Sequence, residues 1–435
     1  MRVDGYPLIG DYGVVGDGRT AALISTDGAV EWLCLPDLDS PSVFGAMLDA
    51  ARGGRFELAP EPPFETDRRY LPGTNVLETT HRTSTGVVRV IEAFTLEAGI
   101  PPPWRELVRR VEGLEGTVEL RWSVEPGFDY GARAATFTEM AEGFVADGPA
   151  CRIGVLAWDA GVPEVRGDGA VLAGRFSTGP GSRSTLALVG DGRRPLRLPS
   201  RGSVERRLEG TIRDWRDWIS RSTYRGQWAG AVERSLLALK LLQNPETGAI
   251  AAAATASLPE RIGGDRNLDY RFGWIRDIAF TLEALMRLGF EDDAHRSLLW
   301  LLDAVAGSHP RPAPLYALGG GPAPSSRELP LPGYRGSRPV MIGNQAVSQL
   351  QLSGWGDLLQ AVWMHVERGA NVLDARTGER LADLADVLAA TWPHPDAGLW
   401  ELREPAQFAN SKMGCWVAFD RILNLVDWGQ VPPRH

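Results

Sequence analysis

The apolar residues of this chain change their spacing near residue 200, and this change constrains the fold more than any other feature. Before that point, short runs of apolar residues are separated by turns rich in glycine and proline. After it, apolar residues recur every three to four positions, as Val232, Leu236 and Leu239 do. Short runs between turns are typical of strands, and a period of 3.6 is typical of helices. The sequence therefore predicts a β-rich part followed by an α-helical part.

The first part is predicted to be a series of hairpins. Residues 21–25 and 29–34 flank Asp27-Gly28, a dipeptide that adopts the left-handed geometry of a tight hairpin turn. Further short strands with frequent turns follow. This arrangement indicates an antiparallel β-sandwich, which we assign to residues 1–200.

The second part is predicted to hold a linking helix over residues 201–225 and an all-α domain over residues 226–435. About six helices follow the linking helix, and the fourth is expected to begin at Asn344. A stretch rich in Gly, Pro and Ser over residues 307–343 precedes it. Such loops border functional sites or form mobile surface insertions, and the sequence leaves both open.

Composition excludes several classes of function. Asp and Glu outnumber Lys and Arg by 55 to 46, and no basic run could neutralise a row of phosphates, so no nucleic acid is expected as a partner. No segment approaches the ~20 apolar residues that cross a bilayer, and no secretory signal pattern opens the chain, so we expect a cytoplasmic protein without a membrane partner. The three cysteines form no CxxC pair and the six histidines no HExxH motif, so no metal site is expected.

The segment RNLDYRFGWIRD, residues 266–277, brings aromatic, basic and acidic side chains together directly before a predicted helix. Arg276 and Asp277 offer donors and an acceptor that suit adjacent hydroxyls of a sugar, and the side chain of Trp274 or of Tyr270 could lie beneath the sugar ring. Asp277 is equally suited to cap the following helix. The residues alone leave both roles open.

The segment PDAGLWELR, residues 395–403, places Glu401 between an indole and a guanidinium. Desolvation by Trp400 would hold the proton of Glu401 to higher pH, as a general acid requires, whereas pairing with Arg403 would favour the charged form. An exposed Glu–Arg pair in a loop is the alternative.

A third segment, LPGYRGSRP followed by GNQ, contributes Tyr334 and Asn344. Amide side chains are hydrogen-bonding partners for hydroxyls, although a single amide is more often a cap. Tyr334, Asn344 and Arg403 are therefore further candidate substrate-binding residues.

These segments resemble glycoside hydrolase family 15, the glucoamylase, glucodextranase and bacterial trehalase family. In the first part, the runs IGDYGVVGDGRTAALISTDGAVEWLCLPDLDSPSVFGAMLD and RRYLPGTNVLETT are similar to the trehalase-like N-terminal domain of bacterial members. In the second part, the resemblance is carried by SLPERIGGDRNLDYRFGWIRD, LPGYRGSRPVMIGN, PDAGLWELR and SKMGCWVAFDR. The likeness covers essentially the whole chain.

The resemblance implies a β-sandwich of the supersandwich type, a linking helix and an (α/α)6 barrel. It also implies inverting hydrolysis of α-glucosidic bonds in trehalose or malto-oligosaccharides, with one carboxylic acid as proton donor and a second carboxylate that activates water. On the family pattern Glu401 is the general acid. Arg276 and Asp277 grip the terminal glucose, and Trp274 and Trp400 form apolar walls.

The sequence departs from the family pattern in three respects. Leu268 stands where the family usually has Trp, and the run from Ser353 to Gly356 replaces a more usual Asp-x-Tyr-Gly. About six helices are counted where the barrel needs twelve, and the segment that bears the general base in the family is not found. We therefore expect a truncated barrel of about half its helices, with doubtful activity.

Several further expectations follow from the resemblance. An open half barrel would expose apolar helix faces and favour a partner or self-association. No cofactor is expected, although phosphate or magnesium dependence is known for some bacterial trehalases of the family. The alternatives to an active hydrolase are a non-catalytic glucose-binding or interaction protein and a truncated gene product.

Overall fold

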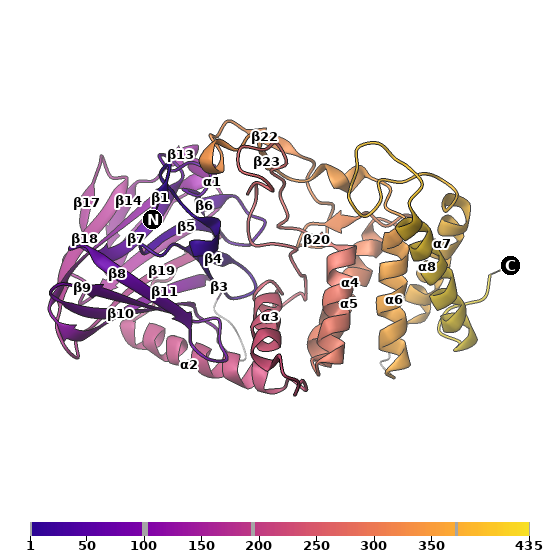
Figure 1. Ribbon diagram of the computed structural model, residues 1–435, viewed down its shortest axis with the longest axis horizontal. Helices are drawn as coiled ribbons and strands as arrows, with labels where there is room; N and C mark the ends of the chain where they lie inside the picture. The colour runs from indigo at the N-terminus through magenta and orange to yellow at the C-terminus, as the bar shows by residue number, and fades with distance from the viewer. Residues whose placement is uncertain (1, 98–102, 193–195, 370–372, 435) are drawn as a thin grey trace.

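The change of apolar spacing near residue 200 coincides with a change from strands to helices in the structure. The chain forms strands from Arg2 to Asp191, and the helix α2 (Arg201–Ser220) leads from them to the helical part. Strands and helices occupy opposite ends of the molecule, with α2 beneath the sheets (Figure 1). The predicted β-rich and α-helical parts are thereby confirmed. The structure is a computed structural model that describes residues 2–97, 103–192, 196–369 and 373–434.

Two antiparallel sheets build the β-rich part. The strands of the first sheet are, in spatial order, β14 (Phe137–Met140), β15 (Gly143–Asp147), β16 (Arg152–Trp158), β19 (Arg183–Asp191), β11 (Arg105–Gly116), β10 (Gly86–Phe94), β9 (Leu77–Thr83) and β8 (Phe64–Tyr70). The second sheet contains β17 (Glu164–Arg166), β18 (Val171–Thr178), β12 (Val118–Gly127), β7 (Gly54–Pro60), β5 (Ala29–Cys34), β4 (Ala21–Ile24) and β3 (Gly13–Gly16), with β13 (Arg133–Ala134) on β12 and β6 (Ser42–Phe44) on β5. Smaller elements beside the sheets are β1 (Arg2–Val3), β2 (Tyr6–Pro7), η1 (Ile9–Asp11) and α1 (Phe128–Gly131).

The two sheets share one apolar core, as the predicted sandwich requires. Val90 and Leu107 of the first sheet belong to the same buried cluster as Phe56 and Trp122 of the second. The indole N–H of Trp122 donates to the carbonyl of Ala160 at 2.8 Å, so its one polar atom is satisfied. Burial of such large side chains between two sheets is the main stabilising contribution in this part.

The hairpin between β4 and β5 shows how the sequence directs a turn. Gly28 has a φ of +87°, a conformation that favours glycine. A Cβ at this position would also lie 2.1 Å from the carbonyl oxygen of Leu58 on the neighbouring strand. Glycine is therefore required both by the turn and by the close approach of the next strand.

Helix α2 packs its apolar face against the first sheet and leads on to the helical part. Its buried residues recur at intervals of three to four positions and are Val204, Leu208, Thr211, Trp215 and Ile219. This spacing places them on one face of a helix, while charged residues occupy the other face. The buried face belongs to the same apolar cluster as the helices that follow.

Six helices follow α2 in the described part of the chain. They are α3 (Ala229–Leu241), α4 (Ile275–Arg287), α5 (Glu291–Gly307), α6 (Ser353–Glu367), α7 (Ala375–Thr391) and α8 (Ala409–Asp427). The predicted number is confirmed, but the predicted start of the fourth helix at Asn344 is wrong. Asn344 instead caps the short 3-10 helix η3 (Gln345–Ser348), because its side chain accepts a hydrogen bond from the amide of Ala346. The long loop before α6 contains β21 (Leu315–Tyr316), β22 (Arg327–Leu329), η2 (Tyr334–Gly336) and β23 (Val340–Ile342).

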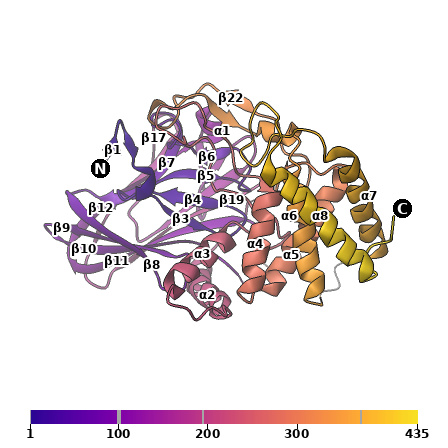
Figure 2. The same ribbon diagram turned by 45° about the vertical axis from the view of Figure 1, so that its right-hand side comes forward.

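Helices α4, α6 and α8 lie side by side in two views of the molecule (Figure 1 and Figure 2). Helices α6 and α8 approach closely because each has a glycine at the crossing. A Cβ on Gly356 would lie 2.4 Å from the carbonyl oxygen of Gly414. No helix in the described ranges is both long enough and apolar enough to cross a bilayer.

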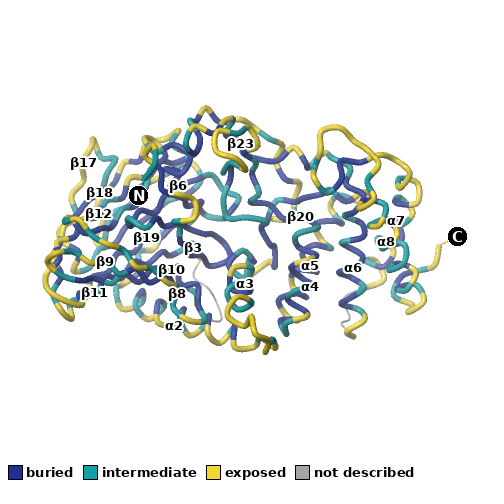
Figure 3. Tube along the Cα trace, viewed as in Figure 1, coloured by how far each residue is buried: buried dark blue, intermediate teal, exposed yellow. Residues whose placement is uncertain are grey.

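One face of α8 carries large apolar side chains that no described residue covers. Met413, Trp416 and Leu423 are each about 60% exposed, at 60%, 60% and 63%. They are spaced by three and seven residues, so they form a stripe along the helix. Exposed stretches alternate with buried ones along α7 and α8 at the helical end of the molecule (Figure 3). We refer to these three residues as the α8 stripe.

Arg271 joins the helical part to the sandwich. Its guanidinium is 2% exposed and lies 2.7 Å from the carboxylate of Asp269. It also donates to the carbonyl oxygens of Leu38 and Ser40, which follow β5. Because an unpaired buried charge is costly, this set of partners fixes where the segment before α4 meets the sandwich.

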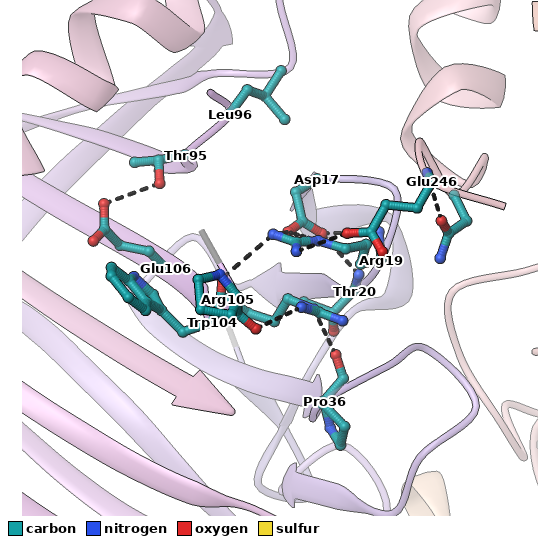
Figure 4. Close-up of polar contacts among 12 residues, drawn as sticks. Asp17, Arg19, Thr20, Pro36, Thr95, Leu96, Trp104, Arg105, Glu106 and Glu246 are labelled. Atoms are coloured by element: carbon teal, nitrogen blue, oxygen red, sulfur yellow. Dashed lines mark hydrogen bonds and ion pairs between the residues drawn. The ribbon is translucent and has the colours of Figure 1, made fainter. Parts of the chain in front are cut away.

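A second set of charges crosses the same boundary. Arg19, in the turn before β4, pairs with Asp17 at 3.1 Å and with Glu246 of the helical part at 3.4 Å (Figure 4). A cavity of about 470 Å³ lies here, between the sheets, α2 and α3. Its Lys240 is held by Asp293 at 2.7 Å. The Arg19–Glu246 pair therefore joins the two parts, whereas Lys240 and Asp293 both belong to the helical part.

Candidate active site

Two segments that are far apart in the sequence meet at Glu401. The strand β20 (Gly273–Trp274) pairs with β21, and α4 begins at the next residue, Ile275. This arrangement buries the indole of Trp274 and places Arg276 and Asp277 in the first turn of α4. The indole N–H of Trp274 donates to Oε1 of Glu401 at 2.8 Å.

All hydrogen bonds and ion pairs that the described residues form with the Glu401 carboxylate reach the same oxygen, Oε1. Besides Trp274, the amide of Gln351 donates to Oε1 at 3.3 Å, and Nη2 of Arg276 lies 3.7 Å from the same atom. The side chain is 13% exposed. Oε1 is thus fixed by donors, and Oε2 has no hydrogen-bonding partner among the residues that the structure describes.

The loop that carries Glu401 is tied to the starts of two helices. Oδ2 of Asp396 accepts hydrogen bonds from the amide of Leu352 at 2.9 Å and from the hydroxyl of Ser411 at 2.8 Å. Leu352 immediately precedes α6, and Ser411 lies in the first turn of α8. A buried carboxylate with two donors thereby anchors the loop at the level where α6 and α8 begin.

The same loop contains two residues in the left-handed region. Gly398 has a φ of +66° and Glu401 a φ of +55°. The conformation costs a non-glycine residue about 1–2 kcal/mol, and it is retained only where the surrounding structure enforces it. At Glu401 the left-handed backbone conformation directs the carboxylate toward Trp274, whereas the neighbouring side chains point away from Trp274.

A cleft of about 300 Å³ opens at Glu401. The side chains that line it are mostly polar and include two of the predicted substrate-binding residues. Its lining comprises Asp265, Arg266, Leu268, Asn344, Gln345, Ala346, Gln349, Glu401, Leu402 and Arg403. Its volume and its mixture of amide, carboxylate and guanidinium groups suit a sugar residue.

Arg276 and Asp277 lie beside this cleft. Nη2 of Arg276 is 3.8 Å from Asp277 and 3.7 Å from Glu401, so one guanidinium stands between two carboxylates. Burial raises the pKa of Asp277 above its ordinary value, and the charge of Arg276 opposes this rise. The carboxylate of Asp277 accepts a hydrogen bond from its own backbone amide. Its side chain is 44% exposed, so hydroxyls of a ligand can reach it.

Two predicted site residues lie away from the Glu401 carboxylate. Tyr334 is buried against the sandwich, where its hydroxyl donates to the carbonyl of Pro7 at 2.8 Å. Trp400 is 72% exposed and makes no wall for Glu401. Asn344 lines the cleft, but its amide is engaged by the carbonyl of Asp269 at 3.1 Å and by its own capping bond to Ala346. Asn344 therefore forms part of the wall of the cleft.

A further carboxylate near the site was missed by the sequence reasoning. Asp357 lies in α6 and lines a small cleft with Arg276 and Gln351. Burial raises the pKa of Asp357 to about 6, and the charge of Arg276 partly opposes this effect. The signal in the sequence was a single acid in an otherwise apolar stretch of helix, since charged residues rarely occupy such positions without a partner. Across the described ranges no group of three or more His, Cys, Asp or Glu side chains is arranged to hold a metal ion.

Comparison with known sequences identifies both parts of the chain. The family "Glycosyl hydrolases family 15" matches residues 227–431, and "Trehalase-like, N-terminal" matches residues 5–161. A trehalase of Mycolicibacterium smegmatis is 35% identical over 97% of this chain and 66% of the relative. A trehalase of Thermoplasma volcanium is 33% identical over 98% of this chain and 68% of the relative. The chain thus spans about two thirds of the length of these relatives.

A solved structure agrees with the sequence comparison at the level of the fold. The crystal structure of a bacterial glucoamylase complexed with acarbose matches with a TM-score of 0.59 at 11% identity, covering 96% of this chain and 66% of that one. The expected sandwich followed by barrel-type helices is therefore the shared fold, while truncation of the barrel stays a prediction. The sequence and the fold agree, and the chain belongs to glycosyl hydrolases family 15.

Proposed function

We propose that the cleft around Glu401 binds and hydrolyses α-glucosides, with trehalose favoured over malto-oligosaccharides. One observation carries the proposal: in the described residues, the donors around Glu401 all reach Oε1. Oε1 can then remain the carbonyl oxygen of a neutral acid while Oε2 carries the proton that passes to the leaving oxygen. The trehalase names of the relatives at 33–35% identity support the choice of substrate.

The neighbouring charged residues bind the terminal glucose in this proposal. The guanidinium of Arg276 offers several donors, and the carboxylate of Asp277 accepts from hydroxyls. Both lie beside Glu401, which places a bound sugar next to the proton donor. Arg403 and the amide of Gln349 extend the polar wall of the cleft.

The proposed mechanism is inverting. A second carboxylate must then deprotonate a water on the opposite face of the sugar, and each trehalose gives one α-glucose and one β-glucose. Among the described residues Glu401 is the one carboxylate to which we give a role in proton transfer. We propose that residues 1–435 bind trehalose and release little glucose, since general-base assistance is typically worth ~10²–10⁴-fold in rate.

The test is proton NMR of residues 1–435 with trehalose, which resolves the anomers as they form. We expect binding and at most slow release of β-glucose, reduced further in Glu401→Gln because the proton donor is gone. Release that is unchanged in Glu401→Gln would remove Glu401 from the mechanism. Rapid release in the parent protein, lost in Glu401→Gln, would keep the donor and show that a base operates in this chain.

The second candidate function is a non-catalytic glucose-binding protein. It uses the same Arg276 and Asp277, and it is favoured if trehalose binds with no release of β-glucose at all.

For either function we propose that no cofactor is needed, so that chelation with EDTA leaves trehalose binding unchanged. We also propose a cytoplasmic location, which the three buried free thiols of Cys34, Cys151 and Cys415 support.

We propose, finally, that the α8 stripe associates with a second copy of the chain. Three large apolar side chains in a row on one helix exceed the scattered exposure that is normal for a monomer. Arg421 on the same helix pairs with Asp420, so the polar rim of the stripe carries both signs of charge.

A further inference from the structure

Two glutamine side chains from the segment between η3 and α6 are bonded to Glu401. Gln349 and Gln351 stand two positions apart, and Gln351 is buried, at 8% exposure. Nε2 of Gln351 donates to Oε1 of Glu401 at 3.3 Å and to Oε1 of Gln349 at 3.0 Å. Nε2 of Gln349 donates to the backbone carbonyl of Glu401 at 3.3 Å. These three hydrogen bonds close a ring that begins and ends on Glu401, and we refer to it as the glutamine ring.

The contacts of the glutamine ring determine the orientation of both amides. The two N–H groups of Gln351 meet two oxygen acceptors, so a reversed amide would set its oxygen against both of them. Gln349 accepts from Gln351 with its oxygen and donates to Glu401 with its nitrogen. An ionised carboxylate at position 351 would have no proton to donate. The ring therefore requires an amide at this position.

The glutamine ring holds both the backbone and the side chain of Glu401. The φ of Glu401 is +55°, a conformation that a non-glycine residue keeps only where the surrounding structure enforces it. Gln349 binds the backbone carbonyl of Glu401, and Gln351 binds the carboxylate. A change in the backbone would break the first bond, and a rotation of the side chain would break the second. The ring thus couples the left-handed backbone to the direction of the carboxylate.

The backbone of the same segment is bonded to the loop that carries Glu401. The carbonyl of Leu350 accepts from the amide of Ala397 at 2.9 Å, and the amide of Leu352 donates to Asp396 at 2.9 Å. Leu352 immediately precedes α6, so the segment is also fixed relative to that helix. The glutamine ring is therefore built on a support that the loop contacts at two further points.

We propose that Gln351 and Gln349 are positioning residues that hold Oε1 of Glu401 toward Trp274 and leave Oε2 for the substrate. The inference rests on the proposed role of Glu401 as proton donor. The amide of Gln351 carries no net charge, so it can donate to the carbonyl oxygen of a neutral acid, which is the form that gives up a proton. Without the glutamine ring the carboxyl group can rotate, and its proton no longer points in a fixed direction.

The indole N–H of Trp274 reports the position of Glu401 without ligand or turnover, because it donates to Oε1 at 2.8 Å. Its NMR resonance is assigned with Trp274→Phe, and Glu401→Ala gives its position when this acceptor is absent. Gln351→Met removes the amide and keeps an unbranched side chain of similar length. We expect Gln351→Met to move the resonance by about half or more of the way to its position in Glu401→Ala, because the bonds of one network support one another.

Further variants show whether the effect passes through Glu401. Gln407→Met is the matched control, because Gln407 follows in the same loop and donates to the carbonyl of Pro393 at 2.9 Å. It should leave the Trp274 resonance unchanged. Gln349→Met should move the resonance in the same direction as Gln351→Met, and the double variant should move it by less than the sum. In a Glu401→Ala background, Gln351→Met should have no further effect. Gln351→Leu repeats the test if Gln351→Met folds poorly.

Trehalose separates a positioning role from direct binding of the sugar. Gln351→Met should keep the Kd for trehalose within about twofold and lower the slow release of β-glucose by about tenfold or more, because misplacement of a reacting group lowers the rate rather than the affinity. Calorimetric titration and proton NMR measure the two quantities. A larger loss of affinity would make Gln351 a sugar-binding residue and would overturn the positioning role.

Two results with the free protein would also overturn the inference. One is an unchanged Trp274 resonance in both Gln351 variants, and the other is an equal shift with and without Glu401. Failure of the proposed function gives a different result. If the Trp274 resonance behaves as expected while Glu401→Gln leaves trehalose hydrolysis unchanged, the glutamine ring holds Glu401 but Glu401 is not the proton donor.

Discussion

At the scale of single residues, the position of Glu401 depends on a loop in which glycine is needed. Gly398 adopts a φ of +66°, and a Cβ there would lie 2.6 Å from the ring of Phe408. Three residues later the chain must turn Glu401 toward Trp274, so a displacement at Gly398 is transmitted to the carboxylate. Loops that hold functional groups commonly store strain in this way.

Replacement of Gly398 tests this dependence. We expect Gly398→Ala to lower the free energy of unfolding by about 1–2 kcal/mol through the left-handed backbone alone, and to weaken trehalose binding. Gly429→Ala is the matched control, because Gly429 also has a positive φ, of +69°, but nothing within 4 Å. It should lose comparable stability and keep its binding. Urea unfolding and calorimetric titration give the two quantities, and equal binding by both variants would contradict the account.

The surroundings of Glu401 show what the sequence could predict at this scale. Glu401, Trp274, Arg276 and Asp277 were identified as candidates, and the structure brings all four together. Trp400 was expected to cover Glu401 because it is adjacent in sequence. The left-handed turn at Glu401 sends the two side chains in different directions, and a backbone conformation of this kind leaves no signal in a residue pattern.

At the scale of elements, the apolar period predicted the existence of the helices better than their ends. The helix expected from Asn344 begins at Ser353, because Asn344 is used as the cap of a separate short helix. Asp357 in that helix was not recognised as a site residue, since its neighbour Arg276 comes from α4 and only the packing of α4 against α6 brings them together.

The α8 stripe leads to a prediction about association. We expect residues 1–435 to sediment as a species larger than the monomer at micromolar concentration. Trp416→Gln combined with Leu423→Gln should shift the population to monomer, because it removes apolar area from the proposed interface. Sedimentation velocity measures this directly. Leu299→Gln, a similar change at a 41% exposed residue of α5, serves as the control. A monomeric parent protein at high concentration would contradict the proposal.

At the scale of the whole molecule, the sandwich and the helices are joined by buried charges that the sequence could not assign. Arg271 and Asp269 stand in the segment RNLDYR, a few residues before the predicted sugar-binding residues Trp274, Arg276 and Asp277. In the structure they are almost completely buried and connect to the loop after β5. A motif identifies such residues, but only the packing of two parts separated by more than 200 positions shows which of them are structural.

The stability of the whole molecule should depend on pH through two buried histidines. Burial lowers the pKa of His81, in the sandwich, and of His365, in α6, to about 4 in each case. An unfolded histidine has a pKa near 6.5, so the unfolded chain binds more protons between pH 6.5 and pH 4. The stabilising contribution is full above pH 6.5 and is lost as the pH falls toward 4.

Urea unfolding at pH 7 and pH 5 tests this dependence. We expect each buried histidine to contribute a loss of roughly 2 kcal/mol in the free energy of unfolding between the two values. His365→Leu should remove about half of the combined loss, whereas His394→Leu, at an exposed position, should not change it. If the free energy of unfolding depends on pH identically in both variants, His365 has the same pKa in the folded and the unfolded chain, and the account is contradicted.

The measurement that tests the central claim most directly is trehalose binding followed at the Trp274 indole resonance. The claim is that the cleft at Glu401, with Trp274, Arg276 and Asp277 beside it, binds an α-glucoside. We predict a saturable shift of that resonance in the parent protein and in Glu401→Gln, and its loss in Asp277→Ala. A parent protein that shows no shift, or an Asp277→Ala variant that shifts equally, would contradict it.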